Sequence, residues 1–68
     1  MDLVSELKAL RETRGITQEA VAAATGVDQS AVSYWETGKS SPSGSARILL
    51  QNFVEQARKL PKVRERAA

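Results

Sequence analysis

Three glycines, Gly15, Gly26 and Gly38, divide most of the chain into short segments, and each segment before a glycine has the periodicity of an α-helix. Two of these segments are only about eight or nine residues long, a length at which an isolated helix is marginal in water. They must therefore fold as one unit, by packing on each other and on the longer segments. No useful stretch alternates polar and apolar residues as a strand does. We predict an all-α fold, a compact bundle of four or five helices.

Capping residues set the expected bounds of these helices. Asp2, Thr17 and Asp28 stand at N-cap positions, where a side-chain oxygen can accept from a free backbone amide. Pro42 suits the first position of the last helix. The helices are predicted over residues 2–14, 18–25, 29–37 and 42–60. The apolar stripe expected on the last one consists of Ala46, Leu49, Leu50, Phe53, Ala57 and Leu60.

The small size and the missing residue types exclude several classes of protein. A chain of 68 residues buries about 60% of its unfolded surface, enough for one small core. We expect one domain over residues 1–60, followed by a basic, flexible tail over residues 61–68. Without Cys or His there is no disulfide, no usual metal ligand and no imidazole base, and no phosphate-binding glycine loop is present. We expect no metal, no cofactor and no enzyme activity.

The charge is unevenly distributed along the chain. Residues 1–37 carry three basic and six acidic side chains, whereas residues 38–68 carry seven basic and two acidic ones. A basic half of this kind favours an anionic partner such as nucleic acid, or it is only a solubilising tail. The apolar runs are far shorter than the roughly 20 residues that cross a bilayer, and no signal peptide is evident. We therefore expect no membrane association and a cytoplasmic location.

The two short central segments have the layout of a helix-turn-helix, two helices joined by a short turn that contains glycine. Ala22 is small where the second helix crosses closely, and Gly26 suits a turn residue with positive φ. Val27, Val32 and Trp35 are the apolar residues expected to bury the inner side of the turn and of the second helix.

The chain from Leu7 to Pro42 resembles the Cro/Xre (lambda-repressor-like) DNA-binding domains. The resemblance rests on four motifs in order: L-x-x-L-R, G-I-T-Q, A-x-x-x-G-V and W-E-x-G-K-x-x-P. It implies a lambda-repressor-like fold in which the segment after Pro42 is a supporting helix. That segment, PSGSARILL, is also similar to short Xre regulators and to the DNA-binding parts of antitoxins.

In a helix-turn-helix the second helix enters the major groove with its N-terminal residues toward the base edges. The exposed side chains of the predicted helix over residues 29–37 are therefore the candidate base readers, and the resemblance implies the same positions: Gln29, Ser30, Ser33 and Tyr34. Gln29 is the first choice, because its amide can bond adenine bidentately. The alternative for Gln29 and the serines is an ordinary solvated face. The Tyr34 ring either reads a base or packs at the core edge with its hydroxyl toward a phosphate.

DNA phosphates are expected at helix N-termini and near polar side chains that follow the reading helix. Gln18 begins the first of the two central helices, and the resemblance implies that it touches the DNA backbone and braces the first base reader. A second phosphate clamp is predicted after the reading helix, from Lys39, Ser40, Ser41 and Arg47. The alternative for Lys39 is a solvated loop cation.

Arg11 lies close to the apolar face of the first predicted helix and therefore needs a partner for its charge. The resemblance implies an ion pair with Glu36 at the end of the reading helix. We interpret both residues as structural.

The function predicted from these residues is a sequence-specific regulator of transcription that binds double-stranded DNA, a repressor of bacterial or phage type. A homodimer on a pseudo-palindromic operator is expected, because one reading helix covers few base pairs. The alternative is an antitoxin-like or co-regulatory protein whose main partner is another protein. Ile48, on the polar side of the last helix, fits either a protein contact or a single exposed apolar residue.

Overall fold

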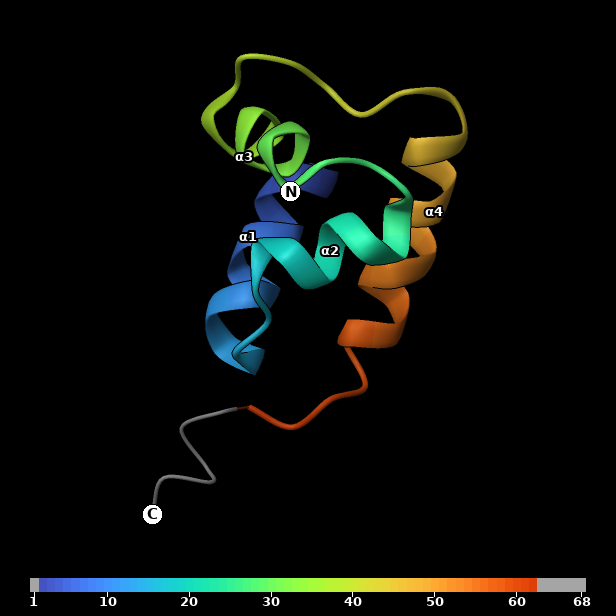
Figure 1. The fold of residues 1–68 in the computed structure, drawn as a ribbon. Coiled ribbons are helices and arrows are strands. Elements are labelled where there is room, and N and C mark those ends of the chain that lie inside the picture. Colours follow the sequence, from blue (N-terminus) through green and yellow to red (C-terminus); the bar gives the residue numbers. More distant parts are fainter. Residues whose placement is uncertain (1, 63–68) are drawn as a thin grey trace.

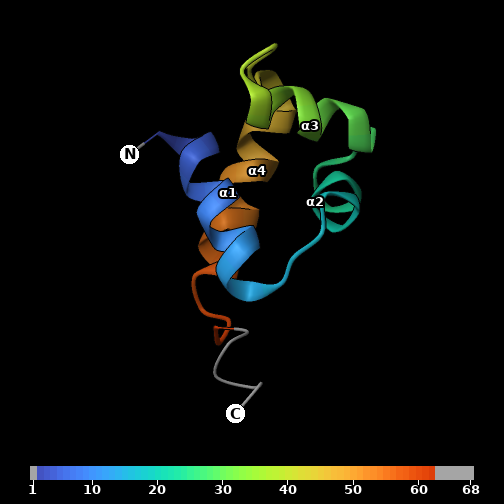
Figure 2. The ribbon, with the colours of Figure 1, turned by 90° about the vertical axis from the view of Figure 1, so that its left-hand side faces the viewer.

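The structure is a computed structural model that describes residues 2–62. These residues form four helices: α1 (Leu3–Arg14), α2 (Gln18–Thr25), α3 (Gln29–Thr37) and α4 (Gly44–Ala57). Helices α1 and α4 run side by side in the same direction, α2 crosses them, and α3 lies across one end (Figures 1 and 2). The predicted all-α, lambda-repressor-like fold is confirmed. No helix among the described residues is long and apolar enough to cross a membrane.

Local capping sets the bounds of α1 and α2 as predicted. The Asp2 carboxylate accepts from the backbone amide of Ser5 at 2.8 Å, and the Thr17 hydroxyl accepts from that of Ala20 at 3.1 Å. Each bond satisfies one of the amides that a helix start leaves without a partner. Both helices end at a glycine in the left-handed conformation, as predicted.

The capping of α3 and the start of α4 differ from the prediction. Asp28 is the N-cap residue of α3, but its carboxylate makes no capping hydrogen bond, and its backbone carbonyl accepts from the Ala31 amide at 3.0 Å. Pro42 lies outside α4 and is buried in the preceding loop. Ser43, the N-cap residue, has an extended backbone with φ −148° and ψ 166°, so that Pro42 before it cannot belong to the helix.

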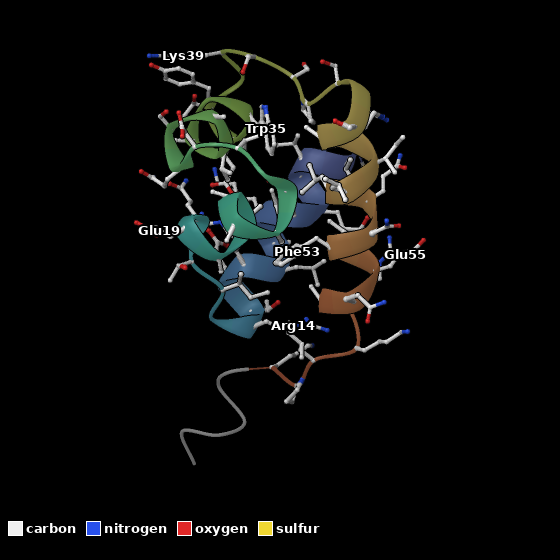
Figure 3. The ribbon with its side chains drawn as sticks, turned by 45° about the vertical axis from the view of Figure 1, so that its right-hand side comes forward. Arg14, Glu19, Trp35, Lys39, Phe53 and Glu55 are labelled. Atoms are coloured by element: carbon white, nitrogen blue, oxygen red, sulfur yellow. The ribbon has the colours of Figure 1, made fainter. Side chains whose placement is uncertain are left out.

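A single core joins the four helices. Its buried apolar residues come from every helix: Leu7, Leu10, Val21, Ala22, Val32, Trp35, Leu50, Val54 and Ala57. Trp35 and the half-buried Phe53 point into the interior, whereas Lys39 and Glu55 project away from it (Figure 3).

The apolar stripe on α4 is rotated from the predicted one. Val54 is buried, although the prediction omitted it, whereas Leu49 and Leu60 are 41% and 48% exposed. Leu49 precedes the buried Leu50 by one residue, which moves its side chain by about 100° around the helix. Leu60 lies beyond Ala57, where the chain has already left the helix. Including these two leucines in the core was therefore wrong.

The segment after α4 is held against α1. The Arg14 guanidinium donates to the backbone carbonyls of Leu60 at 3.1 Å and of Arg58 at 3.3 Å, and Arg58 forms an ion pair with Glu6. The two bonds from Arg14 satisfy backbone carbonyls just beyond the end of α4. Of the predicted tail over residues 61–68, Pro61 and Lys62 are exposed, and the rest lies outside the described residues.

The orientation of α4 predicts that alanine substitutions of two neighbouring leucines lower the free energy of unfolding by different amounts. Leu50→Ala should lower the free energy of unfolding by about 2–5 kcal/mol, because it leaves a cavity in the core. Leu49→Ala, the matched control, should lower it by less than about 1 kcal/mol. Urea denaturation of both variants measures the difference, and equal costs would contradict the assigned orientation of α4.

Candidate nucleic-acid interface

The turn between α2 and α3 sets the position of α3. Gly26 has φ +73°, a conformation that a residue with a side chain adopts only with strain. On the inner side of α3, Val32 and Trp35 are buried in the core. The other side of α3 remains accessible: Gln29, Ser30 and Tyr34 are exposed, and Ser33 is half-buried. The proposed base readers therefore share an accessible helix with a fixed inner face.

Arg11 and Glu36 form a bidentate ion pair between α1 and the last turn of α3. Nε of Arg11 donates to Oε2 of Glu36 at 2.6 Å, and a terminal guanidinium nitrogen donates to Oε1 at 2.7 Å. Arg11 also donates to the backbone carbonyl of Ile16 at 3.2 Å, in the loop that leads into α2. The two side chains are 19% and 5% exposed, so that water competes weakly for this pair. The pair thus ties α1, the entry to α2 and the end of α3 together.

A chain of hydrogen bonds leads from this ion pair to the surface. Nε2 of Gln18, at the start of α2, donates to Oε1 of Glu36 at 3.0 Å. Oε1 of Gln18 in turn accepts from Nε2 of Gln29 at 2.5 Å. The start of α3 is thereby linked to its end through a side chain of α2. We call Arg11, Glu36, Gln18 and Gln29 the polar chain.

The link between Gln18 and Glu36 was not foreseen from the sequence, although Gln18 was expected to brace Gln29. The only signal for it is indirect. A carboxylate that accepts two bonds from arginine still has lone pairs for a further donor. Which donor reaches Glu36 depends on how α2 and α3 pack.

Glu36 is held in its ionised form. Its burial raises the pKa of the carboxyl, but the hydrogen bonds from Arg11 and Gln18, with the positive charges of Arg11 and Lys8, together outweigh the burial and bring the pKa below its usual value. The hydrogen bond to Glu36 is also the main reason why the pKa of Arg11 is raised. At neutral pH the carboxylate of Glu36 therefore acts only as an acceptor.

The loop after α3 places Lys39 beside the reading helix. Its ammonium lies 5.5 Å from the centroid of the Tyr34 ring, within cation–π distance, and its backbone amide donates to the Tyr34 carbonyl at 2.9 Å. The Tyr34 ring is 49% exposed, so it does not pack as a core residue. Lys39 and Tyr34 together present a cation and a hydroxyl at the end of α3.

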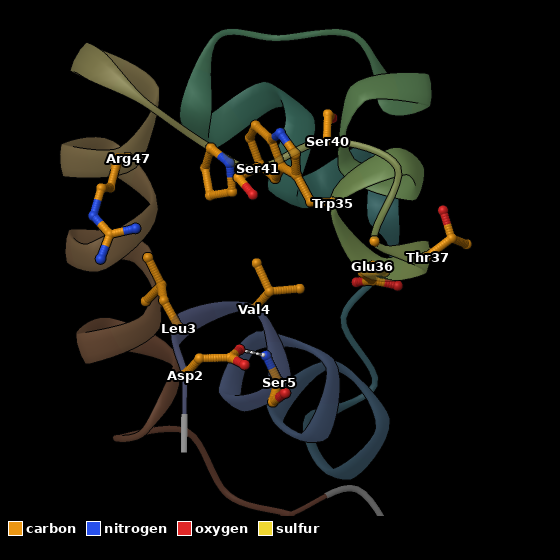
Figure 4. Close-up of a pocket in the computed structure, with 12 residues that line it drawn as sticks. Asp2, Leu3, Val4, Ser5, Trp35, Glu36, Thr37, Ser40, Ser41 and Arg47 are labelled. Carbon is orange, nitrogen blue, oxygen red and sulfur yellow. Dashed lines mark hydrogen bonds between the residues drawn. The ribbon is translucent and has the colours of Figure 1, made fainter.

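Other residues of the predicted phosphate clamp lie along a groove between α1, the end of α3 and the start of α4. Ser40, Ser41 and Arg47 line this groove together with Asp2 and Leu3. Arg47 reaches over it from α4, on the opposite side from Glu36 and Thr37 (Figure 4). The structure thus brings Lys39 to Tyr34, and it brings Ser40, Ser41 and Arg47 to a common groove with residues of α1.

Residues 2–62 contain no group of three or more side chains suited to hold a metal ion. The accessible groups on α3 and the loop after it are an amide, hydroxyls and a cation, which bind by hydrogen bonding and charge, whereas Asp28 just before α3 and Glu19 on α2 expose carboxylates.

Comparison with known proteins gives one match. A protein-family model described as helix-turn-helix matches residues 7–50, which span part of α1, all of α2 and α3 and the first half of α4. No curated protein and no solved structure matches the chain significantly.

The lowered pKa of Glu36 predicts a loss of stability in acid. A group whose pKa is lower in the folded state stabilises the fold above its unfolded pKa, and this contribution is lost as the pH falls through the folded pKa. Glu36→Gln should lower the free energy of unfolding by about 1–3 kcal/mol near neutral pH. In acid, the deficit relative to the wild-type protein should shrink.

Chemical denaturation over a pH series measures this effect. Asp2→Asn is the control for an exposed carboxylate. The pKa of Asp2 is also lowered, by the hydrogen bond from the backbone amide of Ser5, but Asp2 is fully exposed, unlike Glu36. A Glu36→Gln deficit that is the same at every pH would contradict the assigned ionisation.

Proposed function

This chain belongs to the helix-turn-helix family of the Cro/C1 type, and from that premise we propose that it is a sequence-specific repressor that reads operator DNA with α3 in the major groove. Membership of the family makes the chain a DNA-binding regulator. The observation that carries the finer proposal is the polar chain, which fixes the exposed amide of Gln29 at the N-terminal end of α3.

Base reading is assigned to α3. The N-terminal part of a recognition helix lies nearest the base edges, and there α3 exposes Gln29 and Ser30. Ser33 and Tyr34 follow one turn later, where the exposed Tyr34 can reach either a base or a phosphate. Gln29 carries both a donor and an acceptor and is therefore the strongest candidate for direct readout.

Phosphate binding is assigned to both ends of this surface. Gln18 stands at the N-terminus of α2 and retains one amide hydrogen beyond the one given to Glu36. Lys39 supplies the cation at the other end, next to Tyr34. Ser40 and Ser41 follow Lys39 in the same loop, and we keep them as weaker phosphate candidates. Arg47 lines the groove beside α1 together with these two serines, and we keep it as a weaker candidate as well.

A second candidate function is supported by one observation. Ile48 and Leu49 are neighbours on α4 and are 60% and 41% exposed. Such a pair is consistent with an antitoxin-like or co-regulatory protein that binds another protein through α4. It is equally consistent with an apolar contact between the two copies of a homodimer on DNA.

Two substitutions separate base reading from phosphate binding. Gln29→Ala should weaken binding to the selected site by about 1–3 kcal/mol and relax the preference at one base pair. Lys39→Ala should weaken binding to every sequence alike and reduce the salt dependence of binding by about one unit of slope. Fluorescence anisotropy on selected and random duplexes over a salt series measures both. Equal losses for Gln29→Ala on the two duplexes would contradict its role.

Selection of bound sequences from a random duplex library tests the function as a whole. The expected result is an enriched pseudo-palindrome with two half-sites centred about 34 Å apart, bound by a homodimer. A single unrepeated half-site would exclude the dimer. If no sequence is enriched and affinity for DNA stays no better than millimolar at low salt, the protein-binding alternative takes precedence.

A further inference from the structure

Every hydrogen bond of the polar chain is donated toward Glu36, and Glu36 sets that direction. An ionised carboxylate has acceptors and no donor. Gln18 must therefore turn its NH₂ group toward Glu36, as the 3.0 Å contact between Nε2 and Oε1 shows. The carbonyl oxygen of the Gln18 amide then faces the opposite way, where it accepts from Nε2 of Gln29.

The buried end of the polar chain cannot easily reverse. The Glu36 side chain is only 5% exposed, and both of its oxygens accept from Arg11. A protonated carboxyl would place a donor against a guanidinium, which has donors only. Glu36 thus fixes the orientation of the Gln18 amide, and Gln18 in turn orients the amide of the exposed Gln29.

This direction decides which groups Gln29 has left for a base. With one Nε2 hydrogen given to Gln18, Gln29 retains one N–H donor and its Oε1 acceptor. In the major groove adenine offers the complementary pair, the N7 acceptor and the N6 amino donor. If the bonds ran the other way, Oε1 of Gln29 would face Gln18 and two N–H donors would remain. Two donors match guanine, which offers N7 and O6 as acceptors.

We propose that Glu36 determines base specificity without touching DNA: its acceptor-only carboxylate orients Gln18 and, through it, the amide of Gln29, so that Gln29 selects adenine over guanine. Glu36 and Gln18 are positioning residues in this scheme, and Gln29 makes the contact. The inference rests on the proposed function, because it requires that Gln29 reads a base.

The test compares Glu36→Gln with Arg11→Lys. Both substitutions weaken the ion pair, but only Glu36→Gln introduces a donor where the carboxylate stood, which allows the two glutamine amides to reverse. Gln29→Ala first identifies the base pair that Gln29 reads. Affinities are then measured for duplexes that carry adenine or guanine at that position, and thermal melting checks that each variant is folded.

The wild-type protein should prefer adenine there, by roughly 5- to 150-fold for a good bidentate contact. Glu36→Gln should reduce the ratio of adenine to guanine affinity by at least about fivefold, whereas Arg11→Lys should keep the ratio within about twofold. The side-chain amide resonances of Gln29 in the free protein should shift in Glu36→Gln and stay in place in Arg11→Lys.

An unchanged ratio in folded Glu36→Gln would overturn the proposal, as would a wild-type preference for guanine at that position. Where Glu36→Gln does not fold, Gln18→Leu replaces it, because it removes the link and leaves the ion pair intact. It should reduce the same ratio, and an unchanged ratio would again overturn the proposal. A wild-type protein without any base preference would overturn the proposed function itself, which is a different result from a preference that ignores Glu36.

Discussion

The ion pair between Arg11 and Glu36 is the contact on which the arrangement of this small fold depends. Helices α2 and α3 have eight and nine residues, too few to be stable alone. The core holds α3 by its inner face, but a small apolar core leaves rotation and sliding of a short helix weakly defined. The bidentate pair adds a directional contact at the end of α3, and the Arg11 bond to Ile16 extends it to the loop before α2.

The sequence predicted the helix bounds best where local interactions set them. The bounds of α2 and α3 were predicted to the residue, because a capping position and a glycine flank each helix. The start of α4 and its buried face depend instead on packing. The ring of Pro42 is buried in the loop, and the choice of Val54 over Leu49 reflects which side of α4 meets α1 and α2. Neither is encoded by local sequence, because a rotation by one residue leaves the periodicity unchanged.

The sequence indicated candidate residues for the site more readily than the contacts between them. The accessible side of α3 follows from the buried positions of Val32 and Trp35, and the pairing of Arg11 with Glu36 came from the family resemblance. The hydrogen bond between Gln18 and Glu36 joins residues 18 positions apart on different helices, and only the crossing of α2 and α3 brings them together. Arg47 is a similar case: it lies a few residues after the loop in the sequence, and the packing of α4 brings it to the same groove as Ser40 and Ser41.

A carboxylate close to a DNA-binding surface would ordinarily repel phosphates, so its presence in the polar chain needs a physical reason. Arg11 compensates the charge of Glu36 at short range, and the compensated pair is nearly hidden from solvent. Through Gln18, Glu36 therefore affects the surface by orienting the amide of Gln29 and not by exposing a negative charge. Gln29, at the outer end of the polar chain, is exposed, whereas Gln18 is half-buried and the side chain of Glu36 is only 5% exposed. Water therefore competes least for the hydrogen bonds of Glu36, where the direction is set, and most for those of Gln29, which contacts the base. With the inner bonds protected in this way, the polar chain keeps its orientation before DNA binds.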